Sequence, residues 1–215
     1  MREKMSTSLD SVKKAVLISI IMLLLCGLGY PLLLTGVANT FFPSQAKGSL
    51  VEVDGKAVGS PLVGQDFTEA YFMKCRPSSV NYNTYTKEQA ESGAYGGVAS
   101  GSNNFAPSNP ALVARVEADM EAFLKANPQL SKEDIPTDLL TASGSGLDPH
   151  ISPEAAQIQL AAIGEASGLS KEALGKIVSK NTEKKLFGIF GEETVNVLGV
   201  NIEIAQEMGL IGSGK

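Results

Sequence analysis

The pattern of hydrophobic and polar positions divides the chain into one long apolar run and a longer part of mixed polarity. The apolar run covers residues 15–38, which are 24 residues without a charged side chain. A helix rises about 1.5 Å per residue, so roughly 20 residues cross a hydrocarbon core. The run also lacks the polar stripe of a soluble amphipathic helix. It predicts one transmembrane helix between a short N-terminal segment (1–14) and a domain over residues 39–215.

Three other interpretations of the apolar run stay open. A cleaved signal peptide has an apolar core of only about 7–15 residues, although Gly36, Val37 and Ala38 resemble a small-residue cleavage site. A lipoprotein anchor at Cys26 is disfavoured because Leu25 precedes it, where a small residue is expected. The third alternative is a buried helix in the core of a soluble protein.

Basic residues flank the apolar run unequally. Arg2, Lys4, Lys13 and Lys14 precede it, whereas the first basic residue after it is Lys47. Positive charge is retained on the cytoplasmic side of membranes. We therefore expect a single-pass protein of the cytoplasmic membrane, with the N-terminus inside and the main domain outside.

Beyond the run, the sequence predicts a single mixed α+β domain. The pair Asp54-Gly55 between two short β-rich runs predicts a hairpin with a type I′ turn. Helices are predicted over 109–127, with Pro110 at the first helical position, and over 152–168. The remaining predicted elements are a short helix opening at Gly64-Gln65 with Phe67, Tyr71 and Phe72 as core candidates, a helix from Ser170, a strand over 194–198 and a helix over 201–208.

Residues 76–109 are rich in Ser, Asn, Gly and Tyr and contain almost no aliphatic side chains. A stretch this long without secondary structure is typical of a functional loop or of a mobile, solvated segment. Tyr82, Tyr85 and Tyr95 favour a contact surface, because tyrosine combines apolar area with a hydrogen-bonding tip. Composition alone leaves both interpretations open.

Charge and cysteine content narrow the function classes. Four of the 18 basic and two of the 23 acidic residues precede residue 39, so the domain carries a net charge of −7. An acidic domain without a basic run argues against nucleic-acid binding. Cys26 lies in the apolar run and Cys75 in the domain, and there is a single His. We therefore expect neither an intrachain disulfide nor a metal site.

The run from Thr141 to His150 is the most unusual part of the domain. Its Ser143-Gly144-Ser145-Gly146 core, close to a predicted helix start, offers backbone N–H groups of the kind that bind phosphate. The Lys-Ser/Thr that completes a P-loop is missing, so this nucleotide signal is weak. A tight turn packed under a partner is the alternative, and we expect a side chain at Gly144 or Gly146 to disturb it.

A hydrolase is a further interpretation of the same run. Asp148 and His150 would form a dyad, with Ser143 or Ser145 as the nucleophile. The serines lack the G-x-S-x-G spacing of a nucleophile elbow. Members of a triad also converge from distant segments, rather than from eight neighbouring positions. A membrane-anchored hydrolase is therefore the least favoured interpretation.

Several segments resemble one family in their order and spacing. They are GSPLVGQDF (59–67), YFMKCRPS (71–78), SGSNNFAPSNP (100–110), DLLTASGSGLDPHISPEAAQIQ (138–159) and GEETVNVLGVN (191–201). Together with the N-terminal span, they are similar to the C subunit of the bacterial Kdp potassium-transporting P-type ATPase. The similarity extends over nearly the whole chain.

The resemblance implies a non-catalytic subunit of a membrane complex, without a cofactor of its own. Its partners would be a channel-like subunit that selects K⁺ and a P-type subunit that hydrolyses ATP, besides the lipid around the span. For this family the C subunit is described as a catalytic chaperone that raises the ATP affinity of the hydrolysing subunit. In that account, the Thr141–Gly146 run is compared with nucleotide-contacting loops.

The predicted topology conflicts with a direct nucleotide contact, because ATP lies in the cytosol and the domain outside it. The alternative is a cap over the K⁺ entrance of the channel-like subunit. Candidate nucleotide or partner contacts are Thr141, Ser143, Gly144, Ser145, Gly146, Asp148 and His150. Further candidates for the partner interface are Arg76, Pro77, Ser78, Ser102, Asn103 and Asn109.

Overall fold

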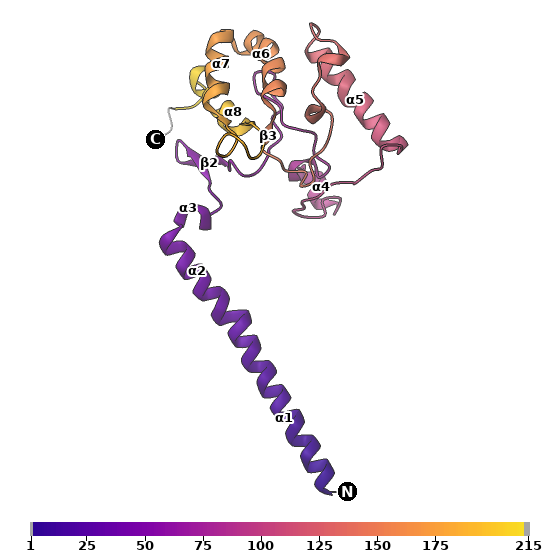
Figure 1. The fold of residues 1–215 in the computed structure, drawn as a ribbon, viewed down its shortest axis with the longest axis vertical. Coiled ribbons are helices and arrows are strands. Elements are labelled where there is room, and N and C mark those ends of the chain that lie inside the picture. Colours follow the sequence, from indigo (N-terminus) through magenta and orange to yellow (C-terminus); the bar gives the residue numbers. More distant parts are fainter. Residues whose placement is uncertain (1, 213–215) are drawn as a thin grey trace. The chain divides into compact units, whose positions relative to one another are not determined.

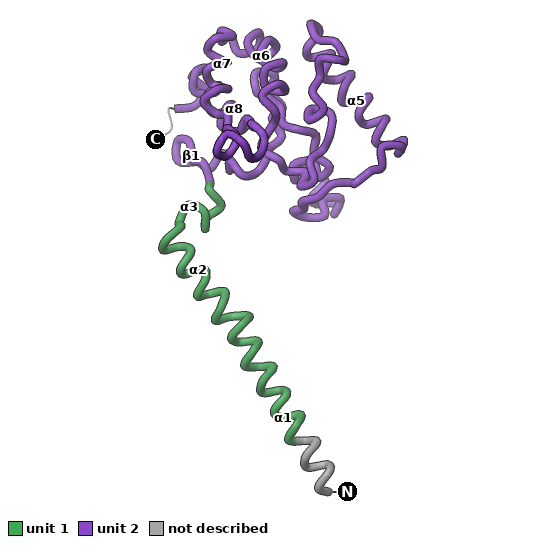
Figure 2. The backbone as a smooth tube through the Cα atoms, viewed as in Figure 1, with its two compact units in different colours: residues 1–49 green, residues 50–215 purple. Residues whose placement is uncertain are grey.

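The computed structural model describes residues 2–212, with side chains from residue 10 onward. The chain divides into two compact units, residues 1–49 and residues 50–215 (Figure 2).

The first unit is helical. α1 (Arg2–Leu24) continues through a π-helical turn, η1 (Leu25–Gly29), into α2 (Tyr30–Phe41), and the short α3 (Pro43–Ala46) follows. The helix is long and apolar enough to cross a membrane over Asp10–Phe41, so it is a candidate transmembrane helix. Its apolar side chains are exposed along its length, which argues against the core helix of a soluble protein.

Two polar side chains near the end of this helix bond to its backbone, and a π-helical turn precedes its proline. The π-helical turn η1 lies just before Pro31, whose nitrogen has no hydrogen to donate. The side chains of Asn39 and Thr40 donate to the carbonyl groups four residues earlier, at 2.9 and 2.8 Å. Internal bonding of this kind is what a helix in lipid requires, because the hydrocarbon core supplies no water.

The second unit begins with the predicted hairpin, which the structure confirms. Its strands are β1 (Val51–Val53) and β2 (Lys56–Gly59), paired antiparallel. Asp54 and Gly55 connect them with φ angles of 51° and 74°, the positive values that a type I′ turn requires.

Three helices pack beside a small antiparallel sheet to form the core of the second unit (Figure 1). The helices are α6 (Pro153–Ser167), α7 (Lys171–Lys180) and α8 (Val197–Glu207). The strands, in spatial order, are β3 (His150–Ile151), β5 (Thr194–Asn196) and β4 (Thr182–Glu183). Leu160, Leu174, Val195 and Ile204 are buried together between helices and sheet.

The predicted helices with strong start signals are confirmed. α5 (Pro110–Ala126) begins after Asn109, whose side chain accepts a hydrogen bond from the N–H of Ala111. Ser152 and Ser170 cap α6 and α7 in the same way. The shorter elements of the second unit are η2 (Asn81–Asn83), α4 (Lys87–Glu91), η3 (Lys132–Asp134) and η4 (Thr137–Leu139).

Two local predictions are wrong. The segment after Gly64 forms no helix up to Val80. The strand predicted over 194–198 ends at Asn196, because the side chain of Asn196 accepts a hydrogen bond from the N–H of Gly199 and caps α8. As a result, α8 begins four residues earlier than predicted.

Two buried amide side chains hold the extended segment around Met73. Asn201 of α8 accepts from the N–H of Met73 at 2.7 Å and donates to its carbonyl oxygen at 2.9 Å. Gln159 of α6 bonds Lys74 in the same way, at 2.8 and 3.3 Å. Asn201 and Gln159 are 2% and 4% exposed, and Met73 is fully buried. Each amide replaces the neighbouring strand that this extended segment lacks. We call this arrangement the amide clamp.

We expect Gln159→Ala to lower the free energy of unfolding by about 1–3 kcal/mol, because it leaves the backbone N–H and carbonyl of Lys74 without partners. Gln157→Ala is the matched control, since Gln157 is exposed on the same helix and its loss should change stability by less than about 0.5 kcal/mol. Unfolding of the full chain in detergent, followed by circular dichroism, compares the two. Equal midpoints would contradict the clamp.

Candidate functional site

The Thr141–His150 turn is folded by its own serine side chains. The N–H of Gly146 donates to Ser143 Oγ at 2.9 Å, and the N–H of Leu147 donates to Ser145 Oγ at 3.1 Å. Ser143 is buried, and Gly146 has a φ of 66°, a left-handed value that glycine adopts without strain. The serine hydroxyls therefore take up N–H groups that a phosphate cradle would need to offer.

The carbonyl groups of the same turn point toward three other segments. The carbonyl oxygen of Ser145 accepts from the N–H of Gly101 at 2.7 Å and from Ser100 Oγ at 3.0 Å. Ser78 Oγ donates to the carbonyl oxygen of Gly146 at 2.6 Å. The next carbonyl, of residue 147, accepts from the N–H of residue 64 at 2.8 Å. Three consecutive carbonyls thus join the turn to segments distant in sequence.

Arg76 connects both ends of the turn. Its Nη1 lies 3.1 Å from Asp148 Oδ2, and its Nε donates to the carbonyl oxygen of Thr141 at 3.4 Å. Both side chains of the ion pair are about one-quarter exposed. A partly exposed ion pair of this kind adds little to the free energy of folding, so its main effect is to orient the Arg76 side chain between the two ends of the turn.

His150 lies between Asp148 and the sheet. Its backbone N–H donates to Asp148 Oδ1 at 3.0 Å, and its Nδ1 is 3.7 Å from the same oxygen. Its Nε2 lies 3.3 Å from the amide nitrogen of Asn196, within hydrogen-bonding distance. Because Asn196 also donates to the carbonyl of Pro61 at 2.8 Å, this imidazole is part of a structural network.

The hydrolase interpretation finds no support in this geometry. Ser143 Oγ and Ser145 Oγ lie 3.2 Å apart and bond to N–H groups of their own turn. Among the residues that the structure describes, no hydrogen bond joins either serine to His150, whose Nε2 faces Asn196. A Ser-His-Asp triad requires a serine on that nitrogen.

A cavity of about 220 Å³ brings together parts of the three predicted interface runs. Pro77, Ser78, Ser102, Asn103 and Thr141 all line it. Arg76, which precedes Pro77 in the first of these runs, does not line the cavity and bonds to the Thr141–His150 turn instead. Asn109 also lies outside the cavity, where it caps α5.

The glycines of the turn differ in their surroundings. A Cβ atom at Gly146 would lie 2.6 Å from the carbonyl oxygen of Gly101, whereas a Cβ at Gly144 would meet nothing within 4 Å. Within this chain the position of Gly144 is therefore open, and a disturbed partner contact on substitution of Gly144 stays a prediction. A Cβ at Gly64 would lie 2.5 Å from the carbonyl oxygen of Asp148, so Gly64 is a close-contact residue of the site that the sequence analysis did not identify.

The tyrosines of the polar loop pack within the loop. Tyr85 and Tyr95 stack with ring centroids 4.0 Å apart, and the hydroxyl of Tyr82 donates to the carbonyl oxygen of Arg76. Burial raises the pKa of Tyr82 well above its usual value, so the hydroxyl stays protonated and donates at every physiological pH.

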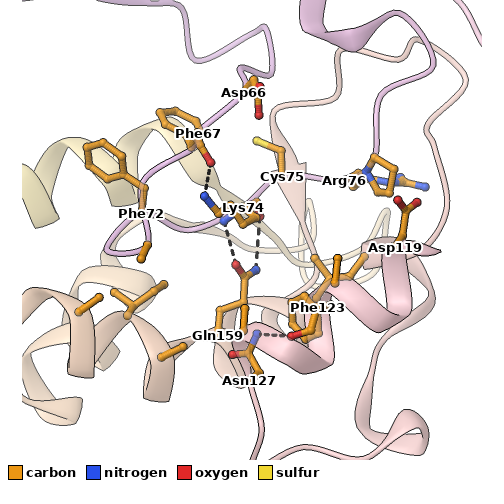
Figure 3. Close-up of a pocket in the computed structure, with 18 of the residues that line it drawn as sticks. Asp66, Phe67, Phe72, Lys74, Cys75, Arg76, Asp119, Phe123, Asn127 and Gln159 are labelled. Carbon is orange, nitrogen blue, oxygen red and sulfur yellow. Dashed lines mark hydrogen bonds between the residues drawn. The ribbon is translucent and has the colours of Figure 1, made fainter. Parts of the chain in front are cut away.

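A larger groove of about 590 Å³ lies between α5 and α6, and sequence reasoning did not predict it (Figure 3). The side chains of Phe67, Phe72 and Phe123 form apolar parts of the groove wall. Lys74, whose backbone is held by the amide clamp, also lines the groove. The Lys74 ammonium donates to the carbonyl oxygens of Phe67 and Glu69. Burial lowers the pKa of Lys74, and the carboxylates of Asp66 and Glu69 oppose that shift.

Cys75 faces the same groove. Burial raises the pKa of its thiol to about 12, so the reactive thiolate is scarce at neutral pH. Asn127 is 4% exposed and also lines the groove. Its amide nitrogen donates to the carbonyl of Phe123 at 2.9 Å, while its Oδ1 has no hydrogen-bond partner among the residues that the structure describes.

Comparison with known proteins decides the family. The profile of the family described as "KdpC: K+-transporting ATPase, c chain" matches residues 12–206. The chain belongs to the KdpC family. It is therefore a subunit of a K⁺-transporting ATPase, as the resemblance predicted, and the structure adds its candidate transmembrane helix.

Curated KdpC subunits from several bacteria are similar to this chain over nearly their full lengths. The "Potassium-transporting ATPase KdpC subunit" of Clostridium kluyveri is 62% identical over 206 residues, which are 96% of this chain and 98% of the relative. The subunit of Clostridioides difficile is 57% identical over 94% of this chain and 100% of the relative. The subunit of Caldanaerobacter subterraneus is 42% identical over 93% of this chain and 96% of the relative.

We expect Gly146→Ala to lower the free energy of unfolding of the domain by about 2 kcal/mol or more. A left-handed φ costs a residue with a Cβ about 1–2 kcal/mol. In addition, the new Cβ would collide with the carbonyl oxygen of Gly101. Gly144→Ala is the control and should change stability by less than about 0.5 kcal/mol. Thermal unfolding of the full-length variants measures the difference. A larger effect at Gly144 than at Gly146 would show that the turn is folded differently.

Proposed function

We propose that this KdpC-family chain is a non-catalytic, single-span accessory subunit whose domain lies outside the cytosol and docks on the partner subunits of the ATPase. In this proposal it supports assembly, and it raises the ATP affinity of the hydrolysing subunit through the assembly, without touching nucleotide. The domain would lie over the K⁺ entrance of the channel-like subunit.

The main observation behind the proposal is the direction in which the backbone N–H and carbonyl groups of the Thr141–His150 turn point. The N–H groups of Gly146 and Leu147 are taken by serine hydroxyls, and the carbonyls of Ser145, Gly146 and Leu147 face neighbouring segments. A phosphate group needs the reverse arrangement, with N–H groups converging on the ligand. The turn is therefore better suited to shape a surface than to bind ATP.

The helix start beside the turn supports the same conclusion. The carboxylate of Asp138 accepts from the N–H of Ser152 at 2.7 Å and from its hydroxyl at 3.2 Å. Ser152 Oγ in turn accepts from the N–H of Ala155 at 3.0 Å. An anion of the protein itself thus occupies the N-terminus of α6, where a phosphate would otherwise bind.

The cavity formed by the interface runs offers a docking surface. Asn103 and Asn104 are exposed at its edge, and Phe105 is 38% exposed beside them. An aromatic side chain surrounded by amide groups has the composition of a protein–protein interface. Arg115 also lines the cavity and donates to the carbonyl of Leu140 at 3.1 Å, which ties α5 to the start of the turn.

We expect Asn103→Lys to lower the amount of the chain that co-purifies with the partner subunits, because a bulky charge would enter the docking surface. Gln129→Lys is the matched control: it also replaces an exposed amide by lysine, outside that cavity. Quantitative co-purification in mild detergent compares the two variants. Full recovery of the complex with Asn103→Lys would remove this surface from the interface.

Photo-crosslinking separates the proposal from a nucleotide-contacting regulator. With azido-ATP on the cytosolic side of sealed vesicles that contain the ATPase, we expect label on the hydrolysing subunit and none on residues 141–146 of this chain. Label within 141–146 would refute the proposed absence of nucleotide contact.

A further inference from the structure

The loop between β4 and β5 exposes an unusual amount of apolar surface. Leu186, Phe187, Ile189 and Phe190 are 63%, 84%, 76% and 64% exposed. Elsewhere among the described residues of the second unit, exposed large apolar side chains do not gather four within five positions. Soluble domains rarely expose such a patch unless it has a binding role. We call residues 186–190 the LFGIF loop.

The backbone of the LFGIF loop is bonded within the loop. Leu186 and Phe190 bond to each other across the turn. The N–H of Leu186 donates to the carbonyl of Phe190 at 2.8 Å, and the N–H of Phe190 donates to the carbonyl of Leu186 at 3.0 Å. Those of Gly188 and Ile189 donate to the carbonyls three residues earlier, at 2.9 and 3.2 Å. Phe187 and Gly188 have positive φ and close the turn. Four of the five backbone N–H groups of the loop are thus paired, which lowers the cost of moving the loop into an apolar environment.

Two lysines directly precede the apolar side chains in the sequence. Lys185 lies 3.3 Å from Glu192, whose side chain is 86% exposed, so this ion pair is weak and easily exchanged. Lys184 makes no ion pair among the described residues. Lysines next to aromatic and aliphatic side chains match the boundary between phosphate headgroups and acyl chains, because their long stems follow the apolar surface while the ammonium reaches the phosphate.

The chain itself keeps the domain near a bilayer. The candidate transmembrane helix ends at Phe41 and the second unit begins at Leu50. Nine residues span at most roughly 30 Å. The first lipid surface available to an apolar loop is therefore that of the chain's own membrane.

We propose that the LFGIF loop inserts into the interfacial region of the bilayer as a second membrane contact of this chain, with Lys184 and Lys185 at the level of the phosphate groups. The bound partner is a phospholipid surface. This inference goes beyond the proposed function, since it requires neither the docking surface nor any relation to nucleotide.

The chain contains no tryptophan, so a single introduced one reports its own surroundings. We would reconstitute the full chain carrying Phe187→Trp, and separately Ile189→Trp, into nanodiscs of phosphatidylcholine and phosphatidylglycerol with or without brominated acyl chains. Val98→Trp is the control, because Val98 is 87% exposed and lies in the polar loop. Unchanged thermal unfolding would confirm that each variant is folded.

We expect blue-shifted emission and quenching by brominated lipid for both loop variants, and neither for Val98→Trp. Solvent-like, unquenched emission from both loop variants would overturn the proposal. Emission that shifts only in the assembled ATPase, without quenching by brominated lipid, would also overturn it and assign the loop to a partner protein. None of these results depends on whether Asn103→Lys weakens assembly, so the two proposals fail separately.

Discussion

The site depends on the amide clamp. The extended segment around Met73 pairs with no strand in the part of the chain that the structure describes, and Asn201 and Gln159 supply backbone partners for Met73 and Lys74. Because both amides are buried, the clamp fixes the position of the segment against α6 and α8. Arg76 follows two residues later, so the clamp also sets where its side chain can reach.

What Arg76 reaches is the turn at the centre of the candidate site. It bonds Thr141 and Asp148, and the neighbouring Ser78 bonds Gly146. The carbonyl groups of residues 145–147 in this turn accept hydrogen bonds from other loops, and the N–H groups of Gly146 and Leu147 bond to serine hydroxyls of the turn itself. In the proposed account, this arrangement shapes the surface that the domain presents to other subunits.

The sequence was informative where local physics decides the structure. The apolar run, the Asp54-Gly55 turn and the N-caps at Asn109 and Ser152 act within a few residues, and the structure confirms the elements that they predicted. Gln159 was not recognised as a clamp residue, because its partner lies 85 positions away. Likewise, the serines and glycines of the site were visible as a motif, but the partners of the carbonyl groups of residues 145–147 lie in distant segments.

The side of the membrane on which the domain lies is the central claim, and labelling with a membrane-impermeant maleimide tests it most directly. Cys75 is a poor reporter, because burial raises its pKa to about 12. A single cysteine at the exposed Val98, with Cys26 and Cys75 replaced by serine, is better suited. The account predicts labelling of Val98→Cys in intact cells. Labelling only after the cytosolic face is opened would contradict it.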